Sequence, residues 1–386
     1  MLARRWLMCA VALGALTCSA TSFADSMDPA LGRLVLDNNC RTGGPTGAGD
    51  YYNPASGFRR CRPNDQAFAK LAAELGGAIA PLASHPARTS GFGGYRVSLN
   101  GSFTFIDPNA HYWKFGTQGA KNTTSGLDSI VNRTPDDVVQ VYSIGLAKGF
   151  PFGFELGANF GYIGNTNMVV VGGDVRLALF EGFRKSIPGF LPDVGVGGGV
   201  RTLTGTSEMK LTVASFDAQL SKPIHIAGTV ILHPHVGYQW LRIFGDSGLI
   251  DLTPNTDPIT ACGYRGDNNP ATPDADKSAF DGQPNCSGSS ADFNNNVVFD
   301  AIRLTRHRIN FGAQLRYQMM YFGVHAITDI LTPAEANTKK LDVVDPSDPS
   351  GQTTLQLNNF EDDPRTEGND ALKAQWTMSV ELGAAF

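Results

Sequence analysis

The sequence predicts an all-β fold, a closed antiparallel up-and-down β-barrel of about ten strands (roughly eight to twelve fit the pattern) with a short N-terminal helix. Three observations predict it. Apolar and polar residues alternate with a period of two from about residue 91 to the C-terminus. Short and long connections alternate along the same region. An export-type leader precedes a chain that has no other long apolar run.

The predicted strand at 95–105 shows the alternation most clearly. One face carries Tyr95, Val97, Leu99, Phe103 and Phe105, and the other carries Arg96, Ser98, Asn100, Ser102 and Thr104. Successive side chains of a strand point to opposite faces, so this pattern gives one apolar and one polar face. Similar alternation predicts strands at 138–149, 152–162, 169–179, 194–205, 208–220, 227–244, 302–317, 320–330 and 372–386.

The connections between these strands fall into two classes by length. Those at 148–151, 221–223 and near 319 are short, whereas those at 107–137, 245–301 and 331–371 are long. These three long loops all follow odd-numbered strands, which places them at one end of an up-and-down sheet. The turn at 182–192, on the opposite side, is longer than this rule expects. The two largest are rich in Asp, Asn, Pro, Gly and Ser, so we expect them to be solvated.

Residues 1–24 have the features of a secretory signal peptide. Arg4 and Arg5 precede an apolar stretch, and a small-residue cleavage motif ends the leader. After it, no uninterrupted apolar run reaches the roughly 18 residues that a membrane-spanning helix needs. The sequence therefore predicts a signal peptide at 1–24, an N-terminal segment at 25–90 and a barrel at 91–386.

The N-terminal segment contains a predicted helix at 65–80. Its apolar residues recur at helical spacing; they are Phe68, Leu71, Ala72, Leu75 and Ile79. The helix either enters the lumen as a plug or rests at or beside the periplasmic mouth, and we expect the second. Glycines on the inner faces of the strands leave room for an insert; they are Gly153, Gly157, Gly161, Gly195, Gly197 and Gly199.

The cysteines predict disulfides rather than a metal site. Six are present, of which Cys9 and Cys18 belong to the leader. The others form two local couples, Cys40 with Cys61 and Cys262 with Cys286, among turn residues. In an exported chain this arrangement predicts two loop-closing disulfides. Because no CxxC or Cys/His ligand spacing occurs, we expect neither a metal nor a cofactor.

The polarity of the strands favours lipid around the barrel. An open sheet edge in hydrocarbon leaves backbone groups unpaired at several kcal/mol each, so a lipid-facing sheet must close. Closure turns apolar side chains outward and polar or small ones inward. Aromatic residues near the predicted strand ends then form girdles at the lipid head groups; these are Tyr95, Tyr162, Tyr238, Trp240, Tyr317 and Trp376. The formal charge of −5, which falls by two to −7 without Arg4 and Arg5, argues against nucleic-acid binding.

The last predicted strand carries a resemblance to a known class of proteins. Residues 376–386, Trp-Thr-Met-Ser-Val-Glu-Leu-Gly-Ala-Ala-Phe, alternate in polarity and end in an aromatic. Together with the alternation over 91–386, this resembles the outer-membrane β-barrel proteins of Gram-negative bacteria. The resemblance implies a multi-pass transmembrane barrel in the outer membrane, with Trp376 and Phe386 in a signal for the barrel assembly machinery. It also implies contact with outer-membrane lipids and lipopolysaccharide, and it assigns no subfamily.

The inner face of the predicted barrel carries most of the strand charge. The lumen-lining candidates are Arg96, Glu155, Asp174, Arg176, Arg201, His233, His235, Arg306, Arg308, Arg316 and Glu381. Arginines outnumber acids in this set. One interpretation is a pathway for small anions, and the other is the salt-bridged filling of a narrow barrel.

Histidines offer the main candidates for chemistry. His233 and His235 share one strand face, and His325 shares another with Asp329. Such pairs can serve a metal or acid/base site, but no third ligand of suitable spacing and no catalytic motif accompanies them. A polar barrel interior explains the same residues, so we expect no enzyme.

The leading functional hypothesis is porin-like or channel-type passage of small solutes. The alternative is a non-conducting barrel that presents surface loops for structural or interaction roles, and a rim-sited hydrolase is a third hypothesis. Transport comes first by analogy with the commonest use of such barrels.

Overall fold

A computed structural model describes residues 25–34, 63–83, 85–120, 131–180, 191–251, 296–344, 354–362 and 370–386. The predicted signal peptide lies outside these residues. Cys40, Cys61, Cys262 and Cys286 also lie outside them, so both predicted disulfides stay predictions.

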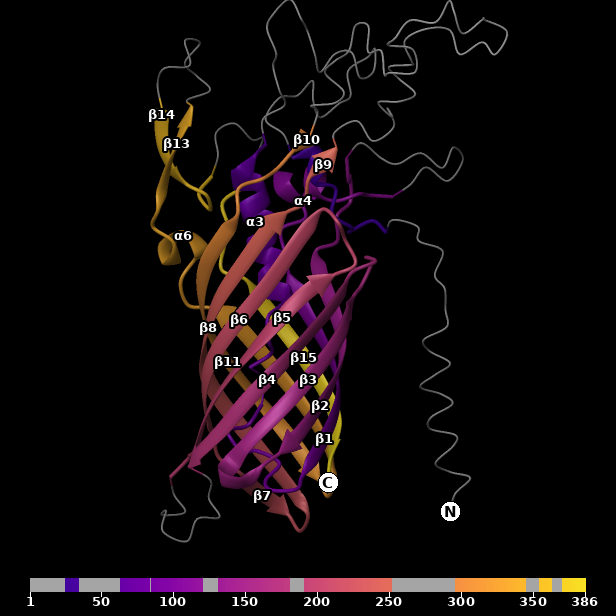
Figure 1. The fold of residues 1–386 in the computed structure, drawn as a ribbon. Coiled ribbons are helices and arrows are strands. Elements are labelled where there is room, and N and C mark those ends of the chain that lie inside the picture. Colours follow the sequence, from indigo (N-terminus) through magenta and orange to yellow (C-terminus); the bar gives the residue numbers. More distant parts are fainter. Residues whose placement is uncertain are drawn as a thin grey trace, which may run out of the picture.

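Ten strands of the described residues form one closed ring (Figure 1). They are β1 (Tyr95–Phe105), β2 (Val138–Gly149), β3 (Phe154–Ile163), β4 (Val169–Phe180), β5 (Asp193–Thr204), β6 (Met209–Ser221), β8 (Val230–Ser247), β11 (Ile302–Tyr317), β12 (Met320–Asp329) and β15 (Trp376–Ala385). Each pairs antiparallel with the ring strands before and after it, and β15 returns to pair with β1. The predicted closed up-and-down barrel and its strand number are confirmed.

The other elements lie inside the ring or near its ends. The helical ones are η1 (Leu31–Arg33), α3 (Asp65–Ile79), α4 (His111–Gly116), η4 (Pro151–Gly153) and α6 (Pro333–Ala336). The strands are β7 (Ile224–Ala227), which pairs with β8, and two hairpin pairs, β9 (Ile250–Asp251) with β10 (Asn296–Val297) and β13 (Lys340–Val344) with β14 (Thr354–Asn358). Among the described helices, none has the length and apolar character needed to cross a membrane.

Strand boundaries depart from the predicted ones where a turn interrupts the alternation. Phe152 has a φ of 64°, in the left-handed region, so the strand predicted from 152 begins at Phe154. Gly228, with a φ of 47°, lies in the tight turn between β7 and β8, so the strand predicted at 227–244 begins only at Val230 and continues to Ser247. The alternation of polarity therefore predicts the strands well, but it does not predict where the turns begin.

The connections define two ends of the barrel (Figure 1). The long-loop end carries the connections that follow β1, β8 and β12, and the short-turn end carries the C-terminus, the turn at η4 and the β7 hairpin. Outer-membrane barrels keep short turns on the periplasmic side and longer loops outside. In keeping with this rule, we call the long-loop end the outer end.

The outward face of the ring is apolar on every strand. Along β1, Leu99 and Phe105 are 55% and 47% exposed, while Ser98, Ser102 and Thr104 are buried on the opposite face. Exposed apolar residues on the other strands include Leu146, Phe160, Val171, Val200, Phe216, Val236, Phe311, Val324 and Met378. Such a surface suits lipid rather than water. The chain has the architecture of an outer-membrane β-barrel.

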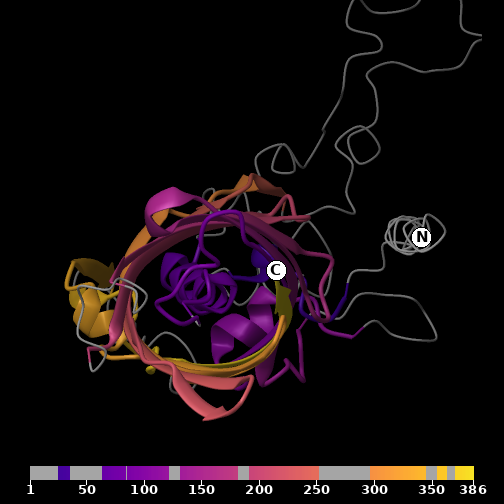
Figure 2. The same ribbon diagram turned by 90° about the horizontal axis from the view of Figure 1, so that it is seen from below.

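The helix α3 occupies the lumen. Viewed along the barrel axis, it lies inside the ring of strands (Figure 2). Its residues 66–79 are all buried, and it contacts β1, β2, β6, β8 and β11. The expectation that this helix rests at the periplasmic mouth is corrected, because the lumen wall offers an apolar surface that matches its apolar residues.

Candidate functional site in the barrel lumen

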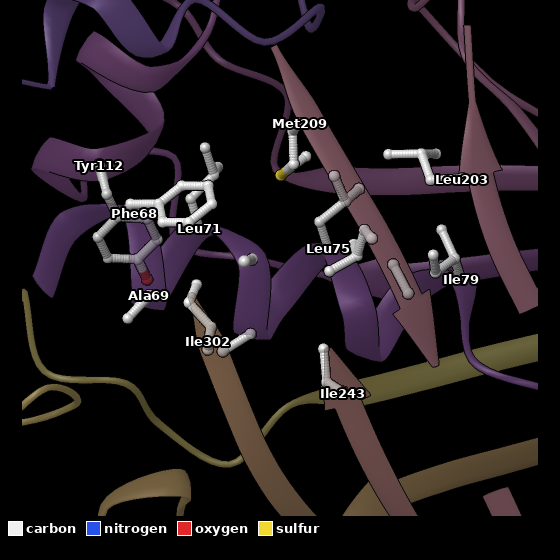
Figure 3. Packing of buried hydrophobic residues seen from close by; sticks show 14 of the residues in the cluster. Phe68, Ala69, Leu71, Leu75, Ile79, Tyr112, Leu203, Met209, Ile243 and Ile302 are labelled. Carbon is white, nitrogen blue, oxygen red and sulfur yellow. The ribbon is translucent and has the colours of Figure 1, made fainter. Parts of the chain in front are cut away.

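The lumen wall is apolar in its long-loop half. Its buried inward side chains there are Val139, Val141, Ile163, Val170, Leu203, Leu211, Val213, Leu241, Ile243, Ile302 and Leu304. They form one cluster with Phe68, Leu71, Leu75 and Ile79 of α3 (Figure 3). The expectation of polar or small inward residues is wrong for this half, because here the wall meets a helix and not water. In the short-turn half, the inward residues are polar or small, as expected.

Three side chains of the wall bind carbonyl oxygens of α3. The pairs are Arg306 Nη1 with Ala73 O at 2.7 Å, Arg308 Nη1 with Gly77 O at 2.9 Å, and Gln375 Nε2 with Glu74 O at 3.1 Å. Asp329 pairs with both guanidinium groups and offsets part of their positive charge. We call Arg306, Arg308 and Gln375 the helix clamp. Hydrogen bonds from charged donors contribute about 1.5–3 kcal/mol each, so the clamp holds α3 firmly.

Beyond α3, the chain crosses the short-turn half as a non-helical stretch, residues 80–83 and 85–90. Inward side chains of neighbouring strands bind its backbone. The pairs are Gln239 Nε2 with Pro81 O at 2.7 Å, Gln219 Nε2 with Ala83 O at 2.9 Å, Arg176 Nη2 with Pro86 O at 2.6 Å, and Ala87 N with Ser221 Oγ at 3.0 Å. We call α3 and this stretch the luminal thread.

Inner-face glycines of β5 make room for the luminal thread. A Cβ added at Gly195 would lie 2.7 Å from Ala87 O, and one added at Gly199 would lie 3.2 Å from the Cβ of Pro81. The space that the sequence leaves on this inner face is thus filled by the chain's own N-terminal segment.

Glu155 fastens the last residues of the thread before β1. Its carboxylate accepts hydrogen bonds from Ser90 N at 2.9 Å and Ser90 Oγ at 2.8 Å. It also pairs with Arg96 at 3.0 Å and Arg176 at 2.9 Å. Because Arg176 binds the thread backbone as well, one ion network joins β1, β3, β4 and the thread.

The arginines of the enclosed lumen are all paired. Arg96 and Arg176 share Glu155, Arg201 pairs with Asp174 at 2.8 Å, and Arg306 and Arg308 share Asp329. A buried charge without a partner costs several kcal/mol, so such pairing is what a filled barrel requires. The geometry favours the interpretation of these residues as filling over an anion pathway.

Arg316 does not line the enclosed lumen. Its side chain is exposed at the short-turn rim, where its Nε donates to Gln318 O at 2.9 Å. Its position has inward parity, but β11 extends beyond the closed part of the ring at that end. The prediction of Arg316 as a lumen residue is therefore corrected.

The N-terminal residues 25–34 are bound to the outer end of the barrel. Their contacts are Met27 N with Asn165 O at 3.0 Å, Ala30 N with Gly116 O at 2.9 Å, Gln118 N with Asp28 O at 2.9 Å, and Leu31 N with Glu208 Oε2 at 2.6 Å. Asn64 N donates to Leu34 O at 2.9 Å just before α3 begins. The chain therefore enters the lumen from the long-loop end and leaves it at the short-turn end.

A polar cavity lies beside the thread in the short-turn half. It offers about 90 Å³ to the centres of water molecules and is lined by Arg96, Asn100, Asn159, Asp174 and Glu381, among others. Since one water molecule needs roughly 10–15 Å³ by this measure, the cavity suits a few ordered waters.

His235 and His325 meet across Gly312 in the short-turn half. Both are in register with Gly312, and His325 Nδ1 lies 3.0 Å from His235 Nε2. A Cβ at Gly312 would lie 2.7 and 3.0 Å from these nitrogens, so the glycine lets the rings touch. His325 Nε2 is 3.9 Å from Glu381 Oε2, beyond hydrogen-bond distance. Both rings are buried, and His233 is buried on the same strand face as His235.

The described part of the chain holds no group of three or more His, Cys, Asp or Glu side chains placed to bind a metal ion.

Most of the predicted girdle aromatics lie at strand ends on the outer surface. Tyr95 and Tyr317 are 51% and 54% exposed at the short-turn end, and Tyr162 and Trp376 are 44% and 45% exposed at the long-loop end. Tyr238 and Trp240 are also outward but lie within β8, which continues to residue 247. Their placement at a strand end is corrected, because β8 is longer than the alternation indicated.

Sequence reasoning missed the amides that bind the thread. Gln219 and Gln375 lie on inner faces, but uncharged residues did not stand out there. One signal was available: Gly237 is the register partner of Gln219, and a Cβ at Gly237 would lie 2.2 Å from Gln219 Oε1. A glycine opposite an inward amide thus marks a side chain that needs room to reach across the lumen.

Comparisons with known proteins add little to this description. No protein-family model and no curated protein matches the sequence. Among solved structures, two crystal structures of Ail, the attachment invasion locus protein of Yersinia pestis, match at 8% and 9% identity, one in complex with the heparin analogue sucrose octasulfate. The matches cover 76% of this chain and 99% of each Ail chain, with TM-scores of 0.21 and 0.22. Such scores carry no functional argument, and the barrel class rests on the strand pairing and the outward surface.

Proposed function

We propose that this chain is an outer-membrane barrel without a standing pore, which holds its own N-terminal segment in the lumen and presents it, with the long loops, at the outer face. This is the non-conducting hypothesis among those the sequence raised, and it includes no enzymatic step. The proposal also includes export through the predicted signal peptide and recognition of the terminal strand by the assembly machinery. Phe386 and Tyr95 exchange backbone hydrogen bonds of 2.7 and 3.0 Å, which supports a closing role for that strand.

The apolar half of the lumen wall carries this proposal. Leu211, Val213, Leu241 and Ile243 all have 0% exposure around α3. Moving each such side chain from a buried site into water costs about 1.5–3 kcal/mol of free energy. Withdrawal of α3 would expose this whole wall, so the helix and the wall stabilise each other. We therefore expect α3 to remain in the lumen rather than to move freely as a gate.

The direction of the luminal thread supports presentation at the outer face. The residues before α3 are hydrogen-bonded at the long-loop end, and the thread ends beside Ser90 and Glu155 at the short-turn end, where β1 begins. Since the long loops of such barrels face outward, residues 25–34 and 63–64 belong to the outer face.

One observation supports the alternative hypothesis of channel-type passage, namely the polar cavity in the short-turn half. Current through planar bilayers separates the two hypotheses. We expect the purified chain to show no steady conductance. We expect Arg306→Gln combined with Arg308→Gln to show brief openings, because the clamp loses its charged donors.

Arg303→Gln is the matched control for the bilayer experiment. Arg303 lies on β11 between inward residues, and its exposed side chain points outward. The control should stay silent like the unmodified chain. Steady current through the unmodified chain would establish a channel and overturn the non-conducting proposal.

Epitope insertion tests the presentation of the N-terminal segment. An epitope placed after Asp25 should bind antibody on intact cells, because residues 25–34 lie at the outer end. The same epitope at Gly228, in the β7 hairpin of the short-turn end, should bind only after the outer membrane is opened. Antibody access to Gly228 and not to Asp25 on intact cells would reverse the assigned direction.

A further inference from the structure

The barrel wall opens at the outer end between β1 and β15. The register of these strands ends at Thr104 and Thr377, whose hydroxyl oxygens lie 2.9 Å apart. Beyond this pair, Ile106 N donates to Asp137 O, on the side of β2. Gln375 N instead donates to Asp329 Oδ2, on the side of β12, at 2.8 Å. The two chain segments are thus held by different neighbours, and a notch separates them.

A pocket fills this notch. Its volume is about 280 Å³, measured as the space open to the centres of water molecules, and its walls include Phe105, Ile106, Tyr112, Ala374 and Trp376. Glu74 of α3 lies at its inner end, with its carboxylate hydrogen-bonded to Trp113 Nε1. The pocket therefore runs from the outer surface of the barrel to the helix in the lumen.

The two sides of the pocket mouth differ in polarity. Phe105 and Trp376 face the lipid side and are 47% and 45% exposed. At the rim, Lys373 Nζ lies 3.6 Å from Asp107 Oδ2, with its side chain 69% exposed. Among the residues that line this pocket, Lys373 is the one cation, and Glu74 and Asp107 are the acids. Trp376 begins its strand at the outer end, which is the level of lipid head groups.

We infer that this lateral pocket binds the acyl chain of an anionic amphiphile from the outer membrane, with its head group beside Lys373. The mouth opens among lipid-facing side chains, so a chain can enter from the bilayer without crossing water. The apolar walls accept methylene groups, and the exposed Lys373 ammonium group can exchange its 3.6 Å contact with Asp107 for the carboxylate or phosphate of a head group. Because the pocket lies outside the luminal thread, this inference stands apart from the proposal that the barrel lacks a pore.

Photo-crosslinking of the whole chain in nanodiscs tests this inference. One arm uses a diazirine-bearing palmitic acid, and the other a phosphatidylglycerol with the same diazirine acyl chain. We expect crosslinks to concentrate in peptides 105–112 and 371–376. The arm that crosslinks more strongly identifies the head group as carboxylate or phosphate, and either outcome supports the site.

Variants give the test its controls. Ala374→Trp fills the pocket and should remove most of the crosslinks at these peptides. Lys373→Ala should weaken crosslinking roughly fivefold, because it removes one partly exposed ionic contact. Phe105→Ala should reduce it, whereas Phe311→Ala should not, since Phe311 has a similar exposure of 45% on a different strand.

Heat-modifiable migration of each variant on gels verifies that the barrel is folded before crosslinks are compared. Crosslinks spread evenly over the lipid-facing strands, and unchanged in Ala374→Trp, would overturn the inference.

Discussion

Replacement of Gly77 by alanine tests the helix clamp most directly. Gly77 lies in the last turns of α3, facing the clamp. A Cβ there would lie 2.2 Å from Gln375 Oε1, 2.4 Å from Arg308 Nη2 and 2.6 Å from Arg306 Nη1. No real Cβ tolerates contacts this short, so the clamp side chains must move.

The expected change in stability follows from two opposing effects. In an exposed helix, Gly→Ala stabilises by about 1 kcal/mol through helix propensity. Here Arg306 and Arg308 both donate to Gln375 Oε1, at 2.9 and 3.1 Å, and displacement breaks these charged hydrogen bonds. At about 1.5–3 kcal/mol each, their loss outweighs the gain and leaves a net destabilisation of roughly 2–5 kcal/mol.

The assay is thermal or denaturant unfolding in detergent micelles, together with limited proteolysis of the luminal thread in the folded barrel. Gly77→Ala should lower the unfolding midpoint and speed cleavage within residues 65–90. A double-mutant cycle with Gln375→Ala should show coupling of at least about 0.5 kcal/mol, because removal of the amide removes the shortest contact. Equal or higher stability of Gly77→Ala, or additive effects, would refute the clamp.

Three further predictions concern other parts of the lumen and its outer end. Ile243→Ala should cost about 2–5 kcal/mol in unfolding free energy, because it opens a cavity against α3; a cost below 1 kcal/mol would contradict the packed wall. Arg176→Gln should raise the proteolysis rate at residues 85–90, with Arg303→Gln unchanged. Burial raises the pKa of the Glu208 carboxyl above the ordinary 4.5, because the charged form is poorly solvated in the folded protein. The contribution of this group to the free energy of unfolding is therefore fully present below pH 4.5 and is lost as the pH rises through the folded-state pKa. The melting temperature of Glu208→Gln, relative to that of the unmodified chain, should therefore increase as the pH rises above about 4.5. A difference in melting temperature that stays constant from pH 4 to 8 would count against this.

Much of the barrel could be predicted from local sequence because strand alternation is a local property. In the strand at 95–105, the strand's own residues show which face is apolar and which is polar. The same holds for 138–149 and 302–317. Alternation and connection length together gave the strand number and the two ends. Turn positions such as Phe152 and Gly228 were missed, since one residue with positive φ leaves the polarity pattern around it intact.

The content of the lumen could not be predicted in the same way. An inward leucine such as Leu211 or Leu241 looks the same in a sequence whether it meets lipid, water or a helix. Likewise, Arg306 and Arg308 suggested an anion pathway as readily as a filled interior. Their partners, Ala73 and Gly77, lie more than 200 residues away along the chain.

The sequence by itself determined that the chain closes into a lipid-facing barrel with long loops at one end, because period-two polarity acts through neighbouring residues. Only the tertiary structure decided that the N-terminal helix fills the barrel and that its backbone is held by Arg306, Arg308 and Gln375. The physical reason is that backbone carbonyls are identical in every residue, so a clamp that binds them leaves almost no mark on the segment it holds.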